Sequence, residues 1–82
     1  MKLELVSNNI KEIDSLVKVL KDLVELDLSE NKYLVSLPEE LCECSSLAKL
    51  KLRECKSLRT LPEKIGELQK LQVFELEGCE EL

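Results

Sequence analysis

The sequence predicts an α/β solenoid, with a curved parallel sheet on its concave side and short helices or turns on its convex side. Leucines recur 24 residues apart, at Leu23, Leu47 and Leu71. Within each period two leucines alternate with a period of two residues, which is typical of a half-buried strand. A Leu-Pro pair follows at the same offset in two periods. The chain of 82 residues is therefore expected to be one domain of about 3.5 repeats, over about 1–22, 23–46, 47–70 and 71–82 (partial).

The repeating unit has the leucine-rich-repeat signature, L-x-x-L-x-L-x-x-N/C followed by a further leucine. The second unit reads Leu23, Leu26, Leu28, Asn31, Leu34, Leu37, Pro38 and Leu41. The third reads Leu47, Leu50, Leu52, Cys55, Leu58, Leu61, Pro62, Ile65 and Leu68, and the fourth reads Leu71, Phe74, Leu76, Cys79 and Leu82. Since the pattern recurs in register, its alternating leucines should point inward from stacked parallel strands.

The position after each predicted strand carries Asn8 and Asn31 in the first two units, then Cys55 and Cys79. An Asn side chain both donates and accepts hydrogen bonds, so it can satisfy buried backbone groups where the chain turns out of the strand. A thiol bonds more weakly, so the later turns should be less well satisfied. Cys44 falls at a core position, and we expect it, Cys55 and Cys79 to be small buried hydrophobic residues.

The returning segments of the second and third units each place a proline before acidic residues. Proline suits the first helical turn, and acids suit the positive end of the helix dipole. Short helices are expected over about 38–44 and 62–68, and Asp14 can cap a further helix near 15–21. Leu16 and Val19 in that segment are expected either to shield the first edge of the solenoid or to form an oligomer contact.

The stretch from Leu47 to Leu82, with Cys at the turn position and L-P-E-x-I-G after it, resembles the repeats of plant nucleotide-binding immune receptors. The first unit, with Asn8-Asn9-Ile10 and Ile13, is more similar to the shorter repeats of other intracellular leucine-rich-repeat proteins. This resemblance implies a protein-binding module. The chain departs from such receptors because it has no phosphate-binding Gly-Lys-Ser loop, so the resemblance identifies a class of repeat.

Composition excludes several classes of function. The net charge is -5 without a basic tract, which argues against nucleic acid or an anionic membrane as the partner. The chain has no histidine, so the usual general base is missing and we expect no enzyme, no small-molecule substrate, no cofactor and no metal site. No export signal is recognisable, so its four cysteines are expected to be free thiols in the cytoplasm.

Charged side chains alternate with the inward leucines and should lie on the concave face. Residues of one row across parallel strands are neighbours at roughly 4.8 Å. The third unit is basic while its neighbours are acidic, which is consistent either with mutual pairing that keeps the sheet soluble or with a surface that binds a protein partner. The mutual pairing is the favoured interpretation. The candidate residues are Glu25, Asp27, Lys49, Lys51, Arg53, Glu75 and Glu77.

Two hypotheses on function follow. The first is a non-catalytic protein-protein interaction scaffold that uses the concave face. The second is a designed or excised solenoid that mainly self-associates through uncapped ends, because open strand edges are templates for pairing. Homo-oligomers are the expected state under this second hypothesis. Its edge residues would be Leu3 and Leu5 on one side and Val73, Phe74 and Leu76 on the other.

Overall fold

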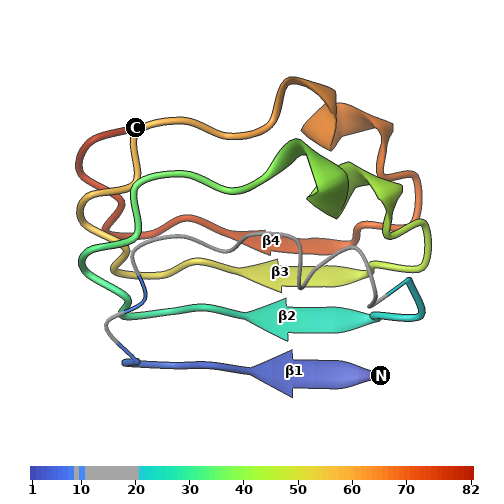
Figure 1. Cartoon of the computed structure of the whole chain (residues 1–82), viewed down its shortest axis with the longest axis horizontal. Coiled ribbons are helices and arrows are strands. Elements are labelled where there is room, and N and C mark those ends of the chain that lie inside the picture. Colours follow the sequence, from blue (N-terminus) through green and yellow to red (C-terminus); the bar gives the residue numbers. More distant parts are fainter. Residues whose placement is uncertain (9, 11–20) are drawn as a thin grey trace.

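The chain folds as a stack of short parallel strands in the computed structural model, which describes residues 1–8, 10 and 21–82. In this part of the chain four strands form one sheet, in the order in which they occur along the sequence (Figure 1). Every strand spans three residues. The strands are β1 (Lys2–Glu4), β2 (Glu25–Asp27), β3 (Lys49–Lys51) and β4 (Val73–Glu75).

The strand register follows the sequence period. Leu3 lies opposite Leu26, Leu26 opposite Leu50, and Leu50 opposite Phe74. Parallel pairing continues past the strands, since the amide of Leu28 donates to the carbonyl of Lys51 at 2.9 Å and that of Leu52 to Glu75 at 2.9 Å. The predicted parallel solenoid is therefore confirmed. The expected helix near 15–21, with Leu16 and Val19, lies outside the described residues.

The core between the sheet and the returning segments is aliphatic. Leu23, Leu28, Leu50 and Leu52 are each 0% exposed, whereas Phe74, which continues the row of Leu26 and Leu50 on β4, is 37% exposed. Complete burial of a leucine side chain stabilises the fold by roughly 1.5–3 kcal/mol. The inward leucines that the period identifies are thus the main source of stability.

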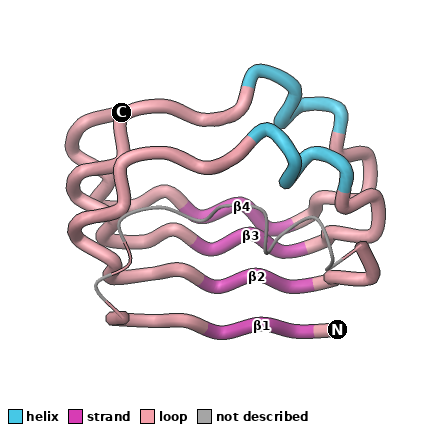
Figure 2. The backbone as a smooth tube through the Cα atoms, in the orientation of Figure 1, coloured by secondary structure: helices cyan, strands magenta, loops and turns pink. Residues whose placement is uncertain are grey.

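The second layer contains two short 3₁₀ helices in the described part of the chain, η2 (Glu39–Glu43) and η3 (Glu63–Glu67). Figure 2 shows both on the side of the molecule away from the strands. Each begins after a proline with φ near the helical value, -73° for Pro38 and -57° for Pro62. The helices expected over 38–44 and 62–68 are therefore present, but they are shorter and of the 3₁₀ type.

Asn31 joins the first two units where the chain leaves the sheet. Its side chain is fully buried, and its Nδ2 donates to the carbonyls of Leu5 at 2.9 Å and Leu28 at 2.7 Å. Its Oδ1 accepts the amides of Asn8 at 3.0 Å and Ile10 at 3.1 Å. This confirms the predicted role of the amide side chain, because it satisfies backbone groups of both units where the chain turns out of the sheet.

Cysteine takes the place of asparagine in the third and fourth units and makes fewer hydrogen bonds there. We call the four equivalent positions, Asn8, Asn31, Cys55 and Cys79, the ladder positions. The Cys55 thiol donates to the carbonyl of Leu28 at 3.2 Å, and the Cys79 thiol donates to that of Leu52 at 2.9 Å. A thiol is a weak donor and a weak acceptor, and each thiol donates to one carbonyl here, where the Asn31 side chain donates to two. Backbone groups also bond to these sulfurs, so the later turns are held by weaker bonds, as predicted.

The residue before each ladder position has left-handed backbone geometry. In the described chain these positive φ angles are 59° at Ser7, 64° at Glu30, 60° at Glu54 and 80° at Gly78. A residue other than glycine is strained in this region, so three of the four units accept that strain and the fourth avoids it. The conformation therefore belongs to the repeat and not to a particular residue type.

We expect Gly78→Ala to lower the free energy of unfolding by about 1 kcal/mol, because alanine pays the left-handed penalty that glycine escapes. The added Cβ would also meet the Glu54 carboxylate, a flexible group that can move. Gly66→Ala is the matched control, since a Cβ there has no heavy atom within 4 Å and η3 tolerates alanine. Urea unfolding compares the two variants, and an equal loss in both would refute the backbone argument.

Candidate functional site

The concave face, meaning the sheet face turned away from η2 and η3, carries the charged rows that the sequence predicts. Lys2, Glu25, Lys49 and Val73 form one row across the strands. Glu4, Asp27, Lys51 and Glu75 form the next. Backbone hydrogen bonds fix these strands, so the side chains start from a rigid platform.

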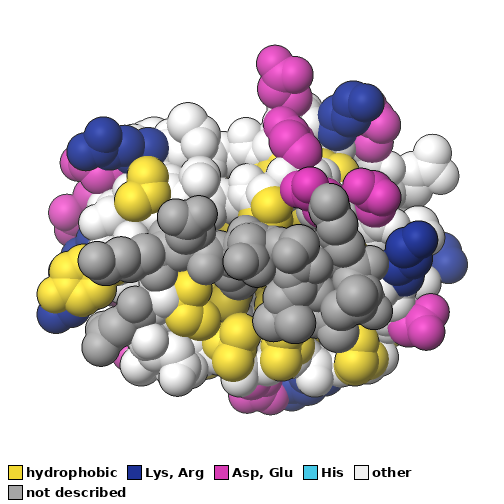
Figure 3. Space-filling model, in the orientation of Figure 1, with side chains coloured by type: hydrophobic (Ala, Val, Ile, Leu, Met, Phe, Trp, Pro, Cys, Tyr) yellow, Lys and Arg dark blue, Asp and Glu magenta, His cyan; other side chains and the backbone are white. Residues whose placement is uncertain are grey.

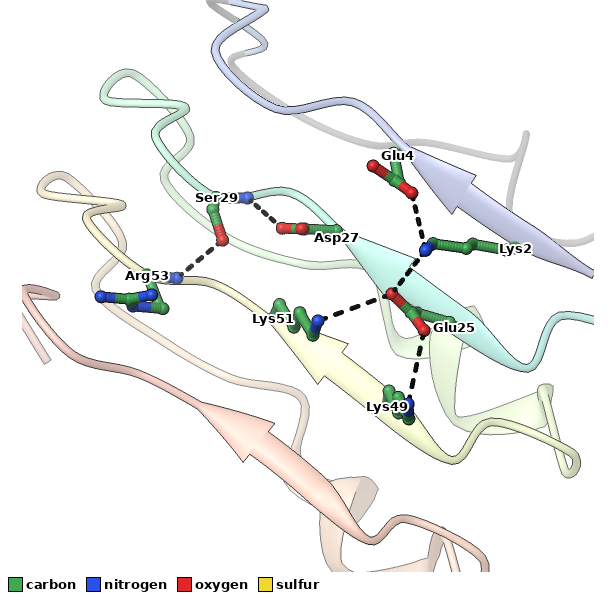
Figure 4. Close-up of polar contacts among 8 residues, drawn as sticks. All are labelled: Lys2, Glu4, Glu25, Asp27, Ser29, Lys49, Lys51 and Arg53. Carbon is green, nitrogen blue, oxygen red and sulfur yellow. Dashed lines mark hydrogen bonds and ion pairs between the residues drawn. The ribbon is translucent and has the colours of Figure 1, made fainter.

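Glu25 is the centre of the network on this face. In the described chain, three lysine ammonium groups surround its carboxylate: Lys2 at 3.5 Å, Lys51 at 3.6 Å and Lys49 at 3.9 Å (Figure 4). Lys2 also pairs with Glu4 at 2.8 Å. Since β2 lies between β1 and β3, one carboxylate on it can reach cations from both sides. The site is therefore organised around a shared anion.

Glu25, one of the residues predicted to meet a partner on the concave face, has little exposed surface. The residue is 9% exposed, because the lysine side chains lie around it. The lysine side chains themselves remain 56% exposed at Lys2, 48% at Lys49 and 30% at Lys51. Glu25 thus positions cations, and the lysines present the surface. The hydrogen bond to Glu4 and the nearby Glu25 charge raise the pKa of Lys2, so its ammonium stays charged.

Lys51 of the second row pairs with a carboxylate of the first row. The register places Asp27 and Glu75 on either side of Lys51, but the ion pair of Lys51 goes to Glu25. Asp27 instead accepts the backbone amide of Ser29 at 3.0 Å. A carboxylate that holds the chain as it turns out of the strand is a structural group, so Asp27 has less freedom to meet a partner than its sequence position suggests.

Arg53 and Glu77 form the pair that the sequence predicts, with Nε and Oε2 3.4 Å apart. Both side chains are well exposed, at 56% and 72%, so the pair contributes at most about 1 kcal/mol. The Arg53 amide donates to the Ser29 hydroxyl at 3.2 Å. A shallow hollow of about 330 Å³ adjoins this pair and is lined by Val6, Asp27, Ser29, Glu30, Lys51, Arg53, Glu54 and Glu75.

A second hollow, of about 520 Å³, lies between η2 and η3 on the convex side. It contains the partly exposed Cys42 and is rimmed by acidic side chains, with Lys64 as its one cation. Burial, followed by the charges of Glu39 and Glu67, raises the pKa of the Cys42 thiol. Within the residues that the structure describes, no cluster of three or more Cys, Asp or Glu side chains is arranged to hold a metal ion.

All four cysteines lie in the described part of the chain, and no disulfide bond joins them. Cys44 and Cys55 are buried as expected. Cys79 is partly exposed, because β4 is an outer strand and only β3 is paired with it in the described chain. Burial raises the pKa of Cys44, Cys55 and Cys79. The thiols therefore stay protonated at neutral pH, which keeps the ladder donors in place and makes the sulfurs poor nucleophiles.

The predicted edge residues lie at the two outer strands. Leu3 and Leu5 are half-buried, and so are Val73 and Leu76. Phe74 is exposed although it occupies a core row. The structure brings Leu3, Leu5 and Leu76 against the leucine core, so their side chains are partly committed to the fold.

A group of exposed residues just after Asn31, namely Lys32, Tyr33 and Val35, is not among the site residues that the sequence predicts. Tyr33 is 47% exposed and Val35 is 46% exposed. The signal is alternation around the buried Leu34, which turns both neighbours outward. Lys32 lies in the same turn, with its Nζ 5.2 Å from the Tyr33 ring centroid.

No helix among the described residues has the length and apolar character needed to cross a membrane.

Comparison with known proteins supports the repeat assignment. A family model described as Leucine Rich Repeat matches residues 22–44, which include β2, the Asn31 turn and η2. No match was found among curated proteins or among solved structures. Together with the parallel sheet and the 3₁₀ turns, the family match identifies the fold as a leucine-rich-repeat solenoid.

Proposed function

We propose that this leucine-rich-repeat solenoid is a non-catalytic protein-interaction scaffold whose concave face contacts its partner. The observation that carries the proposal is the set of exposed lysines held around the nearly buried Glu25 carboxylate. Ordering a long side chain at an interface costs roughly 0.5–1.5 kcal/mol. Lysines that are already held in the free protein lose less of this freedom when a partner arrives.

The family and the composition support the same class of function. Leucine-rich repeats typically serve as interaction modules, and this chain has no histidine for general base catalysis. Its cysteines form no disulfide bond in the described chain, which is consistent with a cytoplasmic location, and we include that location in the proposal. The resemblance of residues 47–82 to repeats of plant immune receptors stays a prediction.

The triple reversal Lys49→Glu, Lys51→Glu and Arg53→Glu is expected to weaken partner binding at least about tenfold, because like charges then face the partner's carboxylates. A partner captured from cell extract by the wild-type chain is purified, and its Kd for both proteins is measured by calorimetry. Circular dichroism checks that the variant is folded.

The control for this prediction is Lys21→Glu, Lys64→Glu and Lys70→Glu, at exposed positions away from the concave face. Both triple variants change the net charge from -5 to -11, since each reversal removes one positive charge and adds one negative charge. Equal Kd values for the concave variant and the wild type would place the binding site elsewhere.

Self-association through the sheet edges is the second candidate. It is favoured by Phe74, which is 37% exposed in a core row, and by the outer edge of β4, to which no strand of the described chain is paired. Light scattering at tens of micromolar, a typical working range for linked assembly, should then give a mass above 9.4 kDa that falls in Phe74→Glu. A monomeric mass for the wild type would contradict this candidate.

A further inference from the structure

The turns that follow the ladder positions stack at one end of the solenoid. The amide of Leu34 donates to the carbonyl of Asn31 at 3.0 Å, and the amide of Leu58 donates to that of Cys55 at 3.2 Å. Lys32 and Tyr33 occupy the centre of the first turn. Because the units are in register, Lys56 occupies the corresponding place in the second. Positions at the tip of a tight turn project away from the core.

Apolar side chains lie beside these lysines. Tyr33 and Val35 are 47% and 46% exposed, on either side of the fully buried Leu34. The backbone amide of Arg59 donates to the carbonyl of Val35 at 2.9 Å, so these two residues are neighbours in adjacent units. We call the surface formed by Lys32, Tyr33, Val35, Lys56 and Arg59 the basic flank.

The cations of the basic flank are poorly neutralised. Among the described residues, neither Lys32 nor Lys56 has an ion pair, and the Nε of Arg59 lies 3.9 Å from Oε1 of Glu81 with both side chains more than half exposed. On the concave face, by contrast, Lys2, Lys49, Lys51 and Arg53 are each within 4 Å of a carboxylate. Lys21, Lys64 and Lys70 also have no ion pair in the described chain, so the basic flank is distinguished by the exposed Tyr33 and Val35 that lie beside its cations.

Two carboxylates next to these turns, those of Glu30 and Glu54, are directed elsewhere, whereas Glu81 lies 3.9 Å from Arg59. Glu30 accepts a hydrogen bond from the Ser7 hydroxyl at 3.0 Å. The Glu54 carboxylate lies over Gly78, in space that the missing Cβ leaves open. At the left end of Figure 3, where the chain turns out of the sheet, dark blue, yellow and some magenta side chains lie near one another, and a larger group of magenta acidic side chains lies at the upper right, over the 3₁₀ helices.

We propose that the basic flank is a second protein-binding surface, distinct from the concave face, and that it takes an acidic segment carrying an apolar side chain. Carboxylates of the segment would meet Lys32, Lys56 and Arg59, and its apolar group would pack on Tyr33 and Val35. Tyrosine and arginine are the residue types enriched where interfaces concentrate their binding energy.

The alternatives to a peptide fit the surface less well. A lipid surface or nucleic acid is attracted by many cations together and is repelled by net negative charge. This flank offers three cations, with Glu80 and Glu81 next along the stack, on a chain of charge -5. A short segment that needs few charges and one apolar contact matches a patch of this size.

The test is an NMR titration in which a synthetic peptide of Glu-Glu-Leu repeats is added to ¹⁵N-labelled protein. Binding should shift the amides of 32–35 and 56–59 and leave those of β2 and β3 in place. Lys32→Glu with Lys56→Glu should weaken the peptide at least about tenfold. Tyr33→Ser, which installs the residue type of position 57, should weaken it severalfold without changing the remaining spectrum.

The matched control is Lys21→Glu with Lys70→Glu, which gives the same net charge and should stay within about twofold of the wild type. The proposal is overturned if the shifts fall on the concave face, if both double variants lose affinity equally, or if a Lys-Lys-Leu peptide binds as tightly. Binding to phosphatidylserine vesicles in preference to the peptide would overturn it too. So would shifts at 32–35 that depend on protein concentration alone, because they would identify a second copy as the occupant. Each of these results leaves binding at the concave face to be decided by the triple reversal described for it.

Discussion

The hydrogen bonds of Asn31 are the constraint on which the arrangement of the units depends. A leucine core favours burial but does not fix how one unit sits on the next, because apolar contacts have no direction. The Asn31 amide does have direction: it holds two carbonyls and two amides from neighbouring units at 2.7–3.1 Å. This contact fixes the second unit on the first, and the backbone hydrogen bonds between strands continue the same register through β3 and β4.

Two surfaces with different electrostatics result from this register. On the concave face, strands one unit apart bring lysines from β1 and β3 to the single carboxylate of Glu25. At the turns, Lys32 and Lys56 occupy corresponding places in adjacent units and have no ion pair in the described chain, while Glu30 accepts a hydrogen bond from Ser7 and the Glu54 carboxylate lies over Gly78. On the concave face the lysines are held by ion pairs with carboxylates, whereas the lysines of the basic flank are exposed and have no ion pair in the described chain.

The sequence was sufficient for the parts of the structure that depend on periodicity. The 24-residue spacing predicts the strands, their register, the leucine core and the role of Asn31, because each follows from which side a residue faces. It could not predict which carboxylate three lysines would share, since this depends on side-chain reach across strands. The 3₁₀ geometry after Pro38 and Pro62 and the partial exposure of Cys79 depend on local backbone fit and on position in the stack, neither of which the period contains.

The most direct test of this account is the free energy of unfolding of Asn31→Cys, measured in urea against the wild type. Cysteine is the residue of the later units, so it preserves the repeat signature and one weak donor while removing the acceptor of the Asn8 and Ile10 amides. We expect a loss of about 2 kcal/mol or more, because buried backbone groups are left without partners. An unchanged free energy of unfolding would contradict the claim that the Asn31 side chain joins the units.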